Sequence, residues 1–106
     1  MNSFYTQIFN RAIALEKSGD YQSALAEYNR IVSDNPGFRP ALINLGALYS
    51  RMKRHDEAMD YFHRALAISE DYLTWFNIGS MHYRAGDYKQ TVIAMTRARR
   101  LRADFV

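Results

Sequence analysis

The stretch NLGALYSRM, from Asn44 to Met52, decides the fold because the chain repeats its pattern. The stretch NIGSMHYRA, from Asn77 to Ala85, starts 33 residues later with the same order: asparagine, aliphatic, glycine, small, apolar. A weaker copy, NRAIALEKS, starts at Asn10, 34 residues before the first. Self-similarity at a fixed period of about 20–50 residues is typical of proteins built from stacked structural units. The sequence therefore predicts three units of one design.

The composition fits a single small array of such units. The 106 residues are 48% hydrophobic and 24% charged, which is ordinary for a globular protein and argues against disorder. Cysteine is absent, which excludes disulfides and thiolate metal ligands. No stretch approaches the ~18 apolar residues of a membrane helix, and no signal peptide is evident at the start. We therefore expect a cytoplasmic protein without a membrane segment.

Each unit contains two apolar-periodic segments joined by a short turn. Leu42, Leu45 and Tyr49 in one segment, and Ala58 and Phe62 in the next, follow the three-and-four spacing of a helix face. No segment alternates with the period of a strand. We predict helices at residues 3–18, 21–34, 39–53, 55–69, 71–85 and 88–102.

The turns inside the first and third units carry helix-ending signals. Gly19 suits the left-handed residue that follows a helix, and Asp20 can cap the next helix; Gly86-Asp87 repeats the pair. The middle turn, Lys53–His55, has neither device. A non-glycine residue in the left-handed conformation costs about 1 kcal/mol, and we expect Asp56 to cap the helix that follows.

Small residues recur in one register of the first helix of each unit. They are Ala12, Gly46 and Gly79. Small residues let two helix backbones approach closely, with larger side chains such as Phe62 and Met95 filling the space around them. We expect each helix pair to be packed at this register.

These residues together resemble the tetratricopeptide repeat. The family pattern of about 34 residues combines leucine-glycine, tyrosine, alanine and an aromatic residue at set places. The second unit carries it as Leu42, Leu45, Gly46, Tyr49, Ala58 and Phe62. The third carries Trp75, Ile78, Gly79, Gly86, Asp87 and Tyr88. The resemblance implies an all-α, right-handed solenoid of three helix-turn-helix pairs, with repeats at about residues 3–36, 37–70 and 71–104.

The outer units depart from the family pattern. Arg11 stands where leucine is usual, Ala12 replaces the glycine, and His82 replaces the tyrosine of the last unit. At the far end, Phe105 has the place that Phe38 holds just before the second unit. Because arrays of this kind usually finish with a polar capping helix, we expect the chain to be a piece of a longer array.

The sequence contains no pattern typical of an enzyme. His55, His63 and His82 are too scattered for a helical metal site, and no carboxylate forms a recognised motif with them. There is no glycine-rich phosphate loop and no serine in a nucleophile-elbow context. We predict a non-catalytic protein with no metal and no cofactor.

The binding hypothesis rests on a column of asparagines: Asn10, Asn44 and Asn77. First helices of stacked pairs line a concave groove, where solenoids bind partners. A side-chain amide has donors and an acceptor that match a peptide unit, so this ladder can hold an extended backbone. The resemblance implies the same, since some members of the family grip peptides through groove asparagines. The plainer interpretation is an asparagine that is simply common at this place in the family.

Neighbouring side chains complete a predicted site for a peptide segment of a partner protein. An apolar strip precedes the asparagines, and a basic column including Lys17 follows them at one rim. The basic column suits acidic ligand residues, although cations at helix ends also favour the helix dipole. Besides the asparagines, the predicted site comprises Phe9, Ile43, Phe76, Ser80, Tyr83, Arg51 and Arg84. We therefore predict a scaffold for protein–protein interaction that binds a partner segment, acidic by preference.

One ligand class of the family is disfavoured. The resemblance would imply a carboxylate clamp for chaperone tails if lysine, asparagine and arginine stood at particular places. This chain has Phe9, Ile13, Leu73 and Asn77 there, and only Asn44 matches. We do not expect a free chaperone C-terminus to bind.

The last predicted helix suggests two alternatives. Six of the 14 basic residues lie from Arg84 onward, four of them between Arg97 and Arg102. Such a cluster can contact phosphates, but no base-reading module accompanies it, so nucleic acid is disfavoured. The Val92, Met95 and Leu101 side of this helix has no predicted cover. Self-association through the last helix, giving a homo-oligomer, is therefore the alternative to peptide binding.

Overall fold

The computed structural model describes residues 3–105. Within this range the chain forms six α-helices and no strand. The helices are α1 (Ser3–Lys17), α2 (Tyr21–Asp34), α3 (Arg39–Arg51), α4 (His55–Ile68), α5 (Tyr72–Arg84) and α6 (Tyr88–Phe105). All six predicted helices are confirmed, and both ends of the first five agree within two residues.

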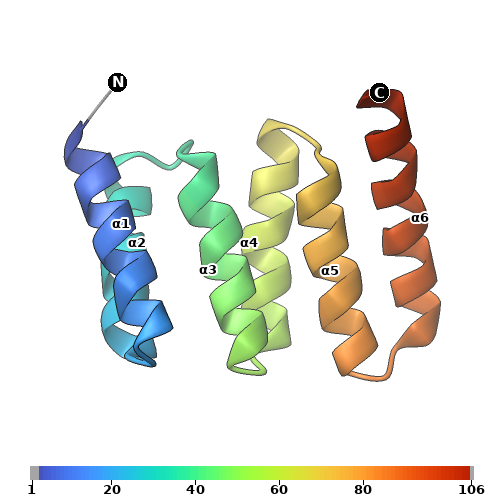
Figure 1. Ribbon diagram of the computed structural model, residues 1–106, viewed down its shortest axis with the longest axis horizontal. Helices are drawn as coiled ribbons and strands as arrows, with labels where there is room; N and C mark the ends of the chain where they lie inside the picture. Colours follow the sequence, from blue (N-terminus) through green and yellow to red (C-terminus); the bar gives the residue numbers. More distant parts are fainter. Residues whose placement is uncertain (1–2, 106) are drawn as a thin grey trace.

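The helices form three antiparallel pairs that stack into an α-solenoid of 37 × 29 × 20 Å. In Figure 1, α1, α3 and α5 lie side by side in front of α2 and α4, and α6 stands next to α5 at the edge of the array. Each first helix packs against the second helix of its own unit, and α3 and α5 also pack on the unit before. The predicted fold class is confirmed.

The core consists of two groups of buried side chains. The N-terminal cluster comes from α1, α2 and α3 with one residue of α4: Ile8, Ala12, Ala24, Leu25, Tyr28, Ile31, Val32, Ala41, Leu42, Leu45, Leu48 and Ala65. The C-terminal cluster joins α4, α5 and α6 through Ala58, Phe62, Ile78, Met81 and Ala94. Helix α4 therefore contributes to both clusters.

The expected close packing of helix pairs is present at two of the small residues. A Cβ atom on Gly46 would lie 2.6 Å from Cδ1 and Cε1 of Phe62, closer than van der Waals contact allows. A Cβ atom on Gly79 would lie 2.9 Å from Cε of Met95. Glycine at these places lets α4 and α6 approach the backbones of α3 and α5.

The turns of the first and third units have the predicted geometry. Gly19 has φ +88° and Gly86 has φ +81°, which is the left-handed region. Asp20 accepts a hydrogen bond from the backbone N–H of Ser23 at 3.3 Å. Asp87 accepts one from the N–H of Gln90, also at 3.3 Å. Each turn thus ends one helix and caps the next.

The prediction that Asp56 caps α4 is wrong. Lys53 takes the left-handed conformation, with φ +63°, and Arg54 is the N-cap residue without a side-chain cap bond. The cap directly follows the left-handed residue in all three turns, so the shared geometry places Arg54 there. Asp56 lies inside the first turn of α4, as does Glu57, which pairs with the Arg54 guanidinium at 2.6 Å.

Arg39 joins the second unit to the third. Its Nε donates to the carbonyl oxygen of Ala65 at 3.2 Å, and its Nη2 bonds both the Ser69 carbonyl and the Asp71 carboxylate. Asp71 also caps α5 by accepting from the N–H of Thr74 at 2.6 Å. Burial acts to raise the pKa of Asp71, but the Thr74 N–H and the Arg39 guanidinium hold that pKa below its usual range. The linker between α4 and α5 lacks a proline, and the hydrogen bonds of Arg39 hold it in place instead.

The last helix is longer than predicted. The sequence pattern ends at residue 102 and places Phe105 in a linker, but α6 runs to Phe105. The first linker contains Pro36 and Gly37, which end a helix, whereas no proline or glycine follows Gly86 in the chain. Nothing therefore breaks α6 at the place where α2 ends.

Candidate functional site

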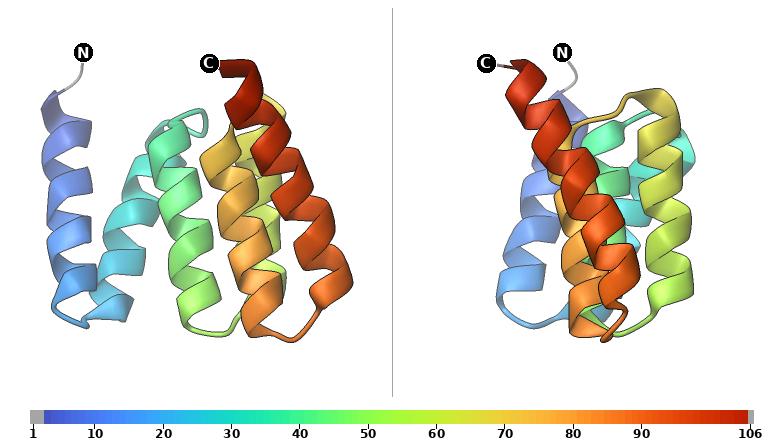
Figure 2. Two further views of the ribbon diagram at one scale, coloured as in Figure 1. Left: turned by 45° about the vertical axis from the view of Figure 1, so that its right-hand side comes forward. Right: turned by 90° about the vertical axis from the view of Figure 1, so that its right-hand side faces the viewer.

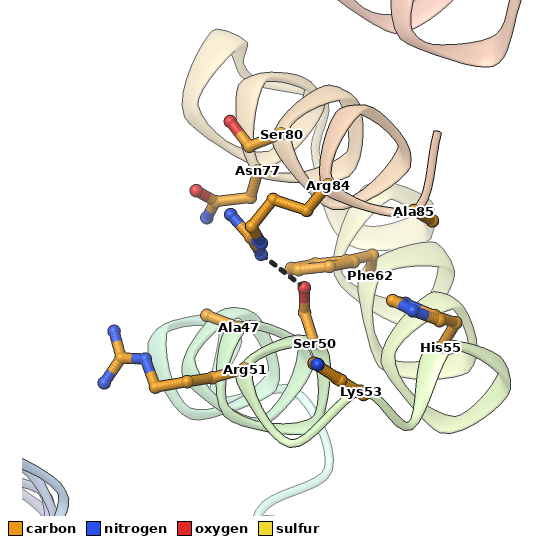
Figure 3. A pocket seen from close by; sticks show the side chains of 10 residues that line it. All are labelled: Ala47, Ser50, Arg51, Lys53, His55, Phe62, Asn77, Ser80, Arg84 and Ala85. Atoms are coloured by element: carbon orange, nitrogen blue, oxygen red, sulfur yellow. Dashed lines mark hydrogen bonds between the residues drawn. The ribbon is translucent and has the colours of Figure 1, made fainter. Parts of the chain in front are cut away.

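The candidate site lies on the inner surface formed by α1, α3 and α5. A small hollow of about 290 Å³ lies between α1 and α3, and a large hollow of about 750 Å³ lies between α3 and α5, where His55 and Phe62 of α4 also line it. Ala47 and Arg51 line both hollows, so the two adjoin along α3. Figure 3 shows the side chains around the large hollow: Ala47, Ser50, Arg51, Lys53, His55, Phe62, Asn77, Ser80, Arg84 and Ala85.

The structure brings two of the three predicted asparagines to these hollows. Asn44 lines the small hollow and Asn77 the large one, and both are half-buried. Asn10 is exposed on α1 and is not among the residues lining either hollow. The side-chain Nδ2 of Asn44 donates to the Tyr28 hydroxyl at 3.2 Å, which uses one of the two N–H donors of that amide.

A polar network behind Asn44 links the first two units. The Tyr28 hydroxyl donates to Oε1 of Glu16 at 3.0 Å, and Nη1 of Arg51 donates to Oε2 of the same carboxylate at 2.8 Å. Tyr28 is fully buried, and this burial, with the negative charge of Glu16, raises its pKa to about 12. The hydroxyl therefore stays protonated at neutral pH. It holds Glu16 and Asn44 in fixed positions on the groove wall.

The large hollow is lined by basic side chains. Arg51, Lys53 and Arg84 line it, and none of its ten described lining residues is acidic. In Figure 3 the Arg84 side chain reaches across to the buried Ser50, whose Oγ accepts its hydrogen bond at 2.7 Å. Because the serine is neutral, this bond leaves the charge of Arg84 uncompensated. Nδ1 of His55 is also buried there, with no hydrogen-bond partner among the described residues.

The predicted apolar strip differs along the array. The Phe9 ring lies edge-on to the rings of Tyr28, at 5.9 Å, and Phe38, at 6.0 Å, and is half-buried. Ile43 is likewise half-buried and packs against the N-terminal cluster. Phe76 is 51% exposed. The residue at this position packs against the core in the first two units, whereas the Phe76 ring of the third unit is exposed to solvent.

The remaining predicted residues belong to the third unit. Ser80 lines the large hollow beside Asn77. Tyr83 is exposed, and its ring centre lies 5.7 Å from that of Tyr88 on α6. The structure thus places Ser80 within the candidate site and Tyr83 at its edge, toward α6.

Comparison with known proteins agrees with the repeated geometry. Residues 8–37 and residues 40–72 each match a family model described as Tetratricopeptide repeat. The chain belongs to the tetratricopeptide repeat family. The predicted resemblance is confirmed, and the two matched segments coincide with the first two helix-turn-helix pairs.

The relatives of this chain include a receptor subunit and a member of a complex. The chain is 32% identical over 65 residues to the mitochondrial import receptor subunit TOM70 of Saccharomyces cerevisiae, matching 61% of this chain and 10% of that protein. It is 28% identical over 74 residues to the BBSome complex member BBS4 of Mus musculus, matching 70% of this chain and 14% of that protein. An uncharacterized protein of Methanocaldococcus jannaschii is 30% identical over 66 residues, which are 62% of this chain and 76% of that protein.

The chain thus spans only about a tenth of the length of the first relative. The family and these relatives support a role as a protein–protein interaction scaffold, and they point to a non-catalytic module. Among residues 3–105, no helix is long and apolar enough to cross a membrane. The same residues contain no group of three histidine, aspartate or glutamate side chains placed to hold a metal ion.

The hydrogen bonds made by the arginines of the basic column were not predicted from the sequence. Glu16 and Ser50 bind the arginines of the basic column across the boundary between repeats. The available signal was their spacing, since each partner precedes its arginine by 34 or 35 residues, one repeat length. Lys53 enters the hollow because the turn inside the second repeat is left-handed there.

Proposed function

We propose that the groove on α1, α3 and α5 binds an extended or helical segment of a partner protein, with an acidic side chain at the large hollow. One observation carries the proposal. Asn44 and Asn77 line adjoining hollows, and the larger hollow is lined by Arg51, which pairs with the Glu16 carboxylate, and by Lys53 and Arg84. A ligand with peptide N–H and C=O groups and a negative charge complements both features.

The asparagines would bind the backbone of the segment. Their side-chain amides each pair a donor with an acceptor, as a peptide unit does. Tyr28 fixes the Asn44 amide, so little side-chain entropy is lost when a ligand binds. Exposed Asn10 extends the column by one repeat, and Phe76 offers its ring to an apolar side chain of the segment.

Arg84 would select the acidic side chain. It bonds a neutral hydroxyl in the free protein, and a carboxylate forms a stronger, charge-assisted hydrogen bond with a guanidinium. Arg51 differs, because Glu16 already compensates its charge at 2.8 Å. Within the predicted basic column, Arg84 therefore determines the preference more than Arg51 does.

Peptide arrays test the two roles separately. Random 12-residue peptides, sorted by their content of aspartate and glutamate, are probed with the labelled chain. Asn44→Ala/Asn77→Ala should weaken binding to every peptide that binds the unmodified chain, by about tenfold for two lost neutral hydrogen bonds. Arg84→Gln should remove only the preference for acidic peptides.

A matched control is available outside the groove. Gln22→Ala/Gln90→Ala also removes two side-chain amides, from exposed positions on α2 and α6. This variant should bind as the unmodified chain does, and all variants should keep their helical circular dichroism. The asparagine and arginine variants should melt a few degrees lower, because they lose the bonds of Asn44 to Tyr28 and of Arg84 to Ser50. Equal binding by the asparagine variant and the control would refute the backbone-binding role.

A further inference from the structure

The hydrogen-bond donors that line the large hollow are mostly unused. Lys53, Asn77 and Ser80 line it, and their side chains make no hydrogen bond or ion pair with any residue from 3 to 105. Arg84 makes one side-chain bond, to the neutral Ser50 hydroxyl, which leaves most N–H donors of its guanidinium free. The lining therefore suits a ligand that is rich in hydrogen-bond acceptors.

The corresponding interface one repeat earlier, between α1 and α3, contains its own anion. There the Glu16 carboxylate accepts hydrogen bonds from Arg51 at 2.8 Å and from the Tyr28 hydroxyl at 3.0 Å. Ser50 and Phe62 hold the places of Glu16 and Tyr28 in the second repeat, 34 residues later. The second interface thus keeps the arginine but lacks the carboxylate, and its hollow measures about 750 Å³ instead of about 290 Å³. An anion from outside the chain can occupy the place that Glu16 fills in the first interface.

Lys53 supplies a second cation at a position where the other repeats have glycine. It has φ +63°, and Gly19 and Gly86 hold the same left-handed position in the first and third repeats. Figure 2 shows the three turns inside the repeats at one end of the stack. Lysine is less stable than glycine in this conformation, and residues held in such conformations cluster at functional sites. The turn of the second repeat thus adds a positive charge to the hollow at a cost in stability.

Two uncompensated cations match a phosphate group better than a carboxylate. A phosphoserine or phosphothreonine side chain carries a charge of about −1.5 to −2 at pH 7 and about three acceptor oxygens. Arg84 and Lys53 both lack an acidic partner, whereas Glu16 already compensates Arg51. A carboxylate, or a phosphodiester of nucleic acid, carries about one negative charge and would leave one of the two cations uncompensated.

We propose that the large hollow binds a phosphoserine or phosphothreonine of the partner segment. The Arg84 guanidinium would bind two of the phosphate oxygens, and the Lys53 ammonium would neutralise the remaining charge. Asn77 and Ser80 would donate to the third oxygen and to the backbone beside it. This inference rests on the proposed function, since it names the ligand of the same groove, and it makes binding depend on phosphorylation of the partner.

A set of matched peptides tests the proposal. Each random 12-residue peptide of the array is made in four versions, with phosphoserine, glutamate, serine or alanine at its centre. The phosphoserine versions should bind the labelled chain about tenfold more tightly than the glutamate versions, because they form at least one more charge-assisted hydrogen bond. The serine and alanine versions should bind least.

Three variants test which residues hold the phosphate. Lys53→Gln keeps a side chain on the left-handed turn and should reduce the preference for phosphoserine over glutamate by about threefold to tenfold. Ser50→Glu should weaken binding of both acidic versions, because it gives Arg84 the carboxylate that the first interface has. Lys89→Gln is the matched control, since it removes a lysine from an exposed position on α6 outside the hollow and should change neither preference. Lys53→Gln decides alone if Ser50→Glu lowers the helical circular dichroism.

The possible outcomes separate this inference from the proposed function. Equal binding of the phosphoserine and glutamate versions would overturn the inference and leave the proposed function intact. A phosphoserine preference that survives Lys53→Gln would place the phosphate elsewhere on the chain. Undiminished phosphoserine binding by Asn44→Ala/Asn77→Ala would instead refute the backbone contacts of the proposed function, and no binding by any version would refute both.

Two competitors exclude other sources of phosphate. A 12-nucleotide oligothymidylate should compete weakly, and inorganic phosphate at the concentration of the peptide should not compete. Equal affinity for the oligonucleotide would assign the hollow to nucleic acid. Full competition by inorganic phosphate would assign it to the free anion.

Discussion

Replacing Gly46 by alanine tests whether close packing of α3 on α4 sets the stability of the array. The added Cβ would lie 2.6 Å from two ring carbons of Phe62 and 2.9 Å from Cζ. Phe62 is fully buried, so its ring cannot swing into solvent. Either the ring or one of the two helices must move.

The expected change in stability of Gly46→Ala is the sum of two opposing contributions. Alanine in place of glycine inside a helix adds up to about 1 kcal/mol of stability. Overpacking of a core costs about 1–3 kcal/mol, and three ring carbons closer than 3 Å place this site near the upper end. The net expectation is a loss of about 1–2 kcal/mol, which lowers the melting temperature of a domain of this size by about 5–15 °C.

Gly79→Ala is the matched comparison. Its Cβ would meet Cε of Met95 at 2.9 Å and Sδ at 3.1 Å, and this side chain is flexible and only half-buried. The variant should be as stable as the unmodified chain, or more stable by up to about 1 kcal/mol. Thermal and urea unfolding followed by circular dichroism measures both variants. Close packing of Gly46 on Phe62 is not limiting if Gly46→Ala is as stable as Gly79→Ala, or if Phe62→Leu does not recover stability in the Gly46→Ala background.

Three further variants test other contacts. Arg39→Met should lower the free energy of unfolding by about 2 kcal/mol, because it removes bonds to two carbonyls and to Asp71. Since the pKa of Asp71 is lowered on folding, the unmodified chain should lose stability as pH falls below about 4; a variant with the same acid dependence would contradict this. Tyr28→Phe should reduce the loss of stability that we expect as pH rises from about 10 to about 12, where the unfolded tyrosine ionises first. Lys53→Gly should add about 0.5–1 kcal/mol in urea unfolding by relieving its left-handed backbone, and a less stable variant would argue against strain there.

The fold could be predicted because similar local sequence signals recur along the chain. Apolar spacing such as that of Leu42, Leu45 and Tyr49 marks the helix faces, and Gly19 and Gly86 mark where helices end. The prediction failed at the turn inside the second repeat, which has the same backbone geometry as the other two turns but lacks their glycine and aspartate. Lys53 adopts the glycine conformation, and Arg54 then occupies the cap in place of the expected Asp56.

The candidate site could be predicted only in part. The column of asparagines follows from helix periodicity, and Asn44 and Asn77 do reach the inner surface. The repeat spacing places Glu16 and Ser50 about one repeat before Arg51 and Arg84, but whether these side chains meet depends on how far neighbouring repeats are rotated. That rotation is a property of packing between units, which spacing within one unit does not encode.

The sharing of α4 between the two clusters has a consequence for how the chain opens. Residues on one side of α4, such as Ala65, belong with α1 to α3, while Ala58 and Phe62 belong with α5 and α6. Detachment of α5 and α6 would therefore expose Phe62 but leave the first three helices with their own interior. Amide protons should exchange with solvent fastest in α6 and slowest in α2 and α3. Unfolding would then proceed stepwise, beginning at the α6 end of the array.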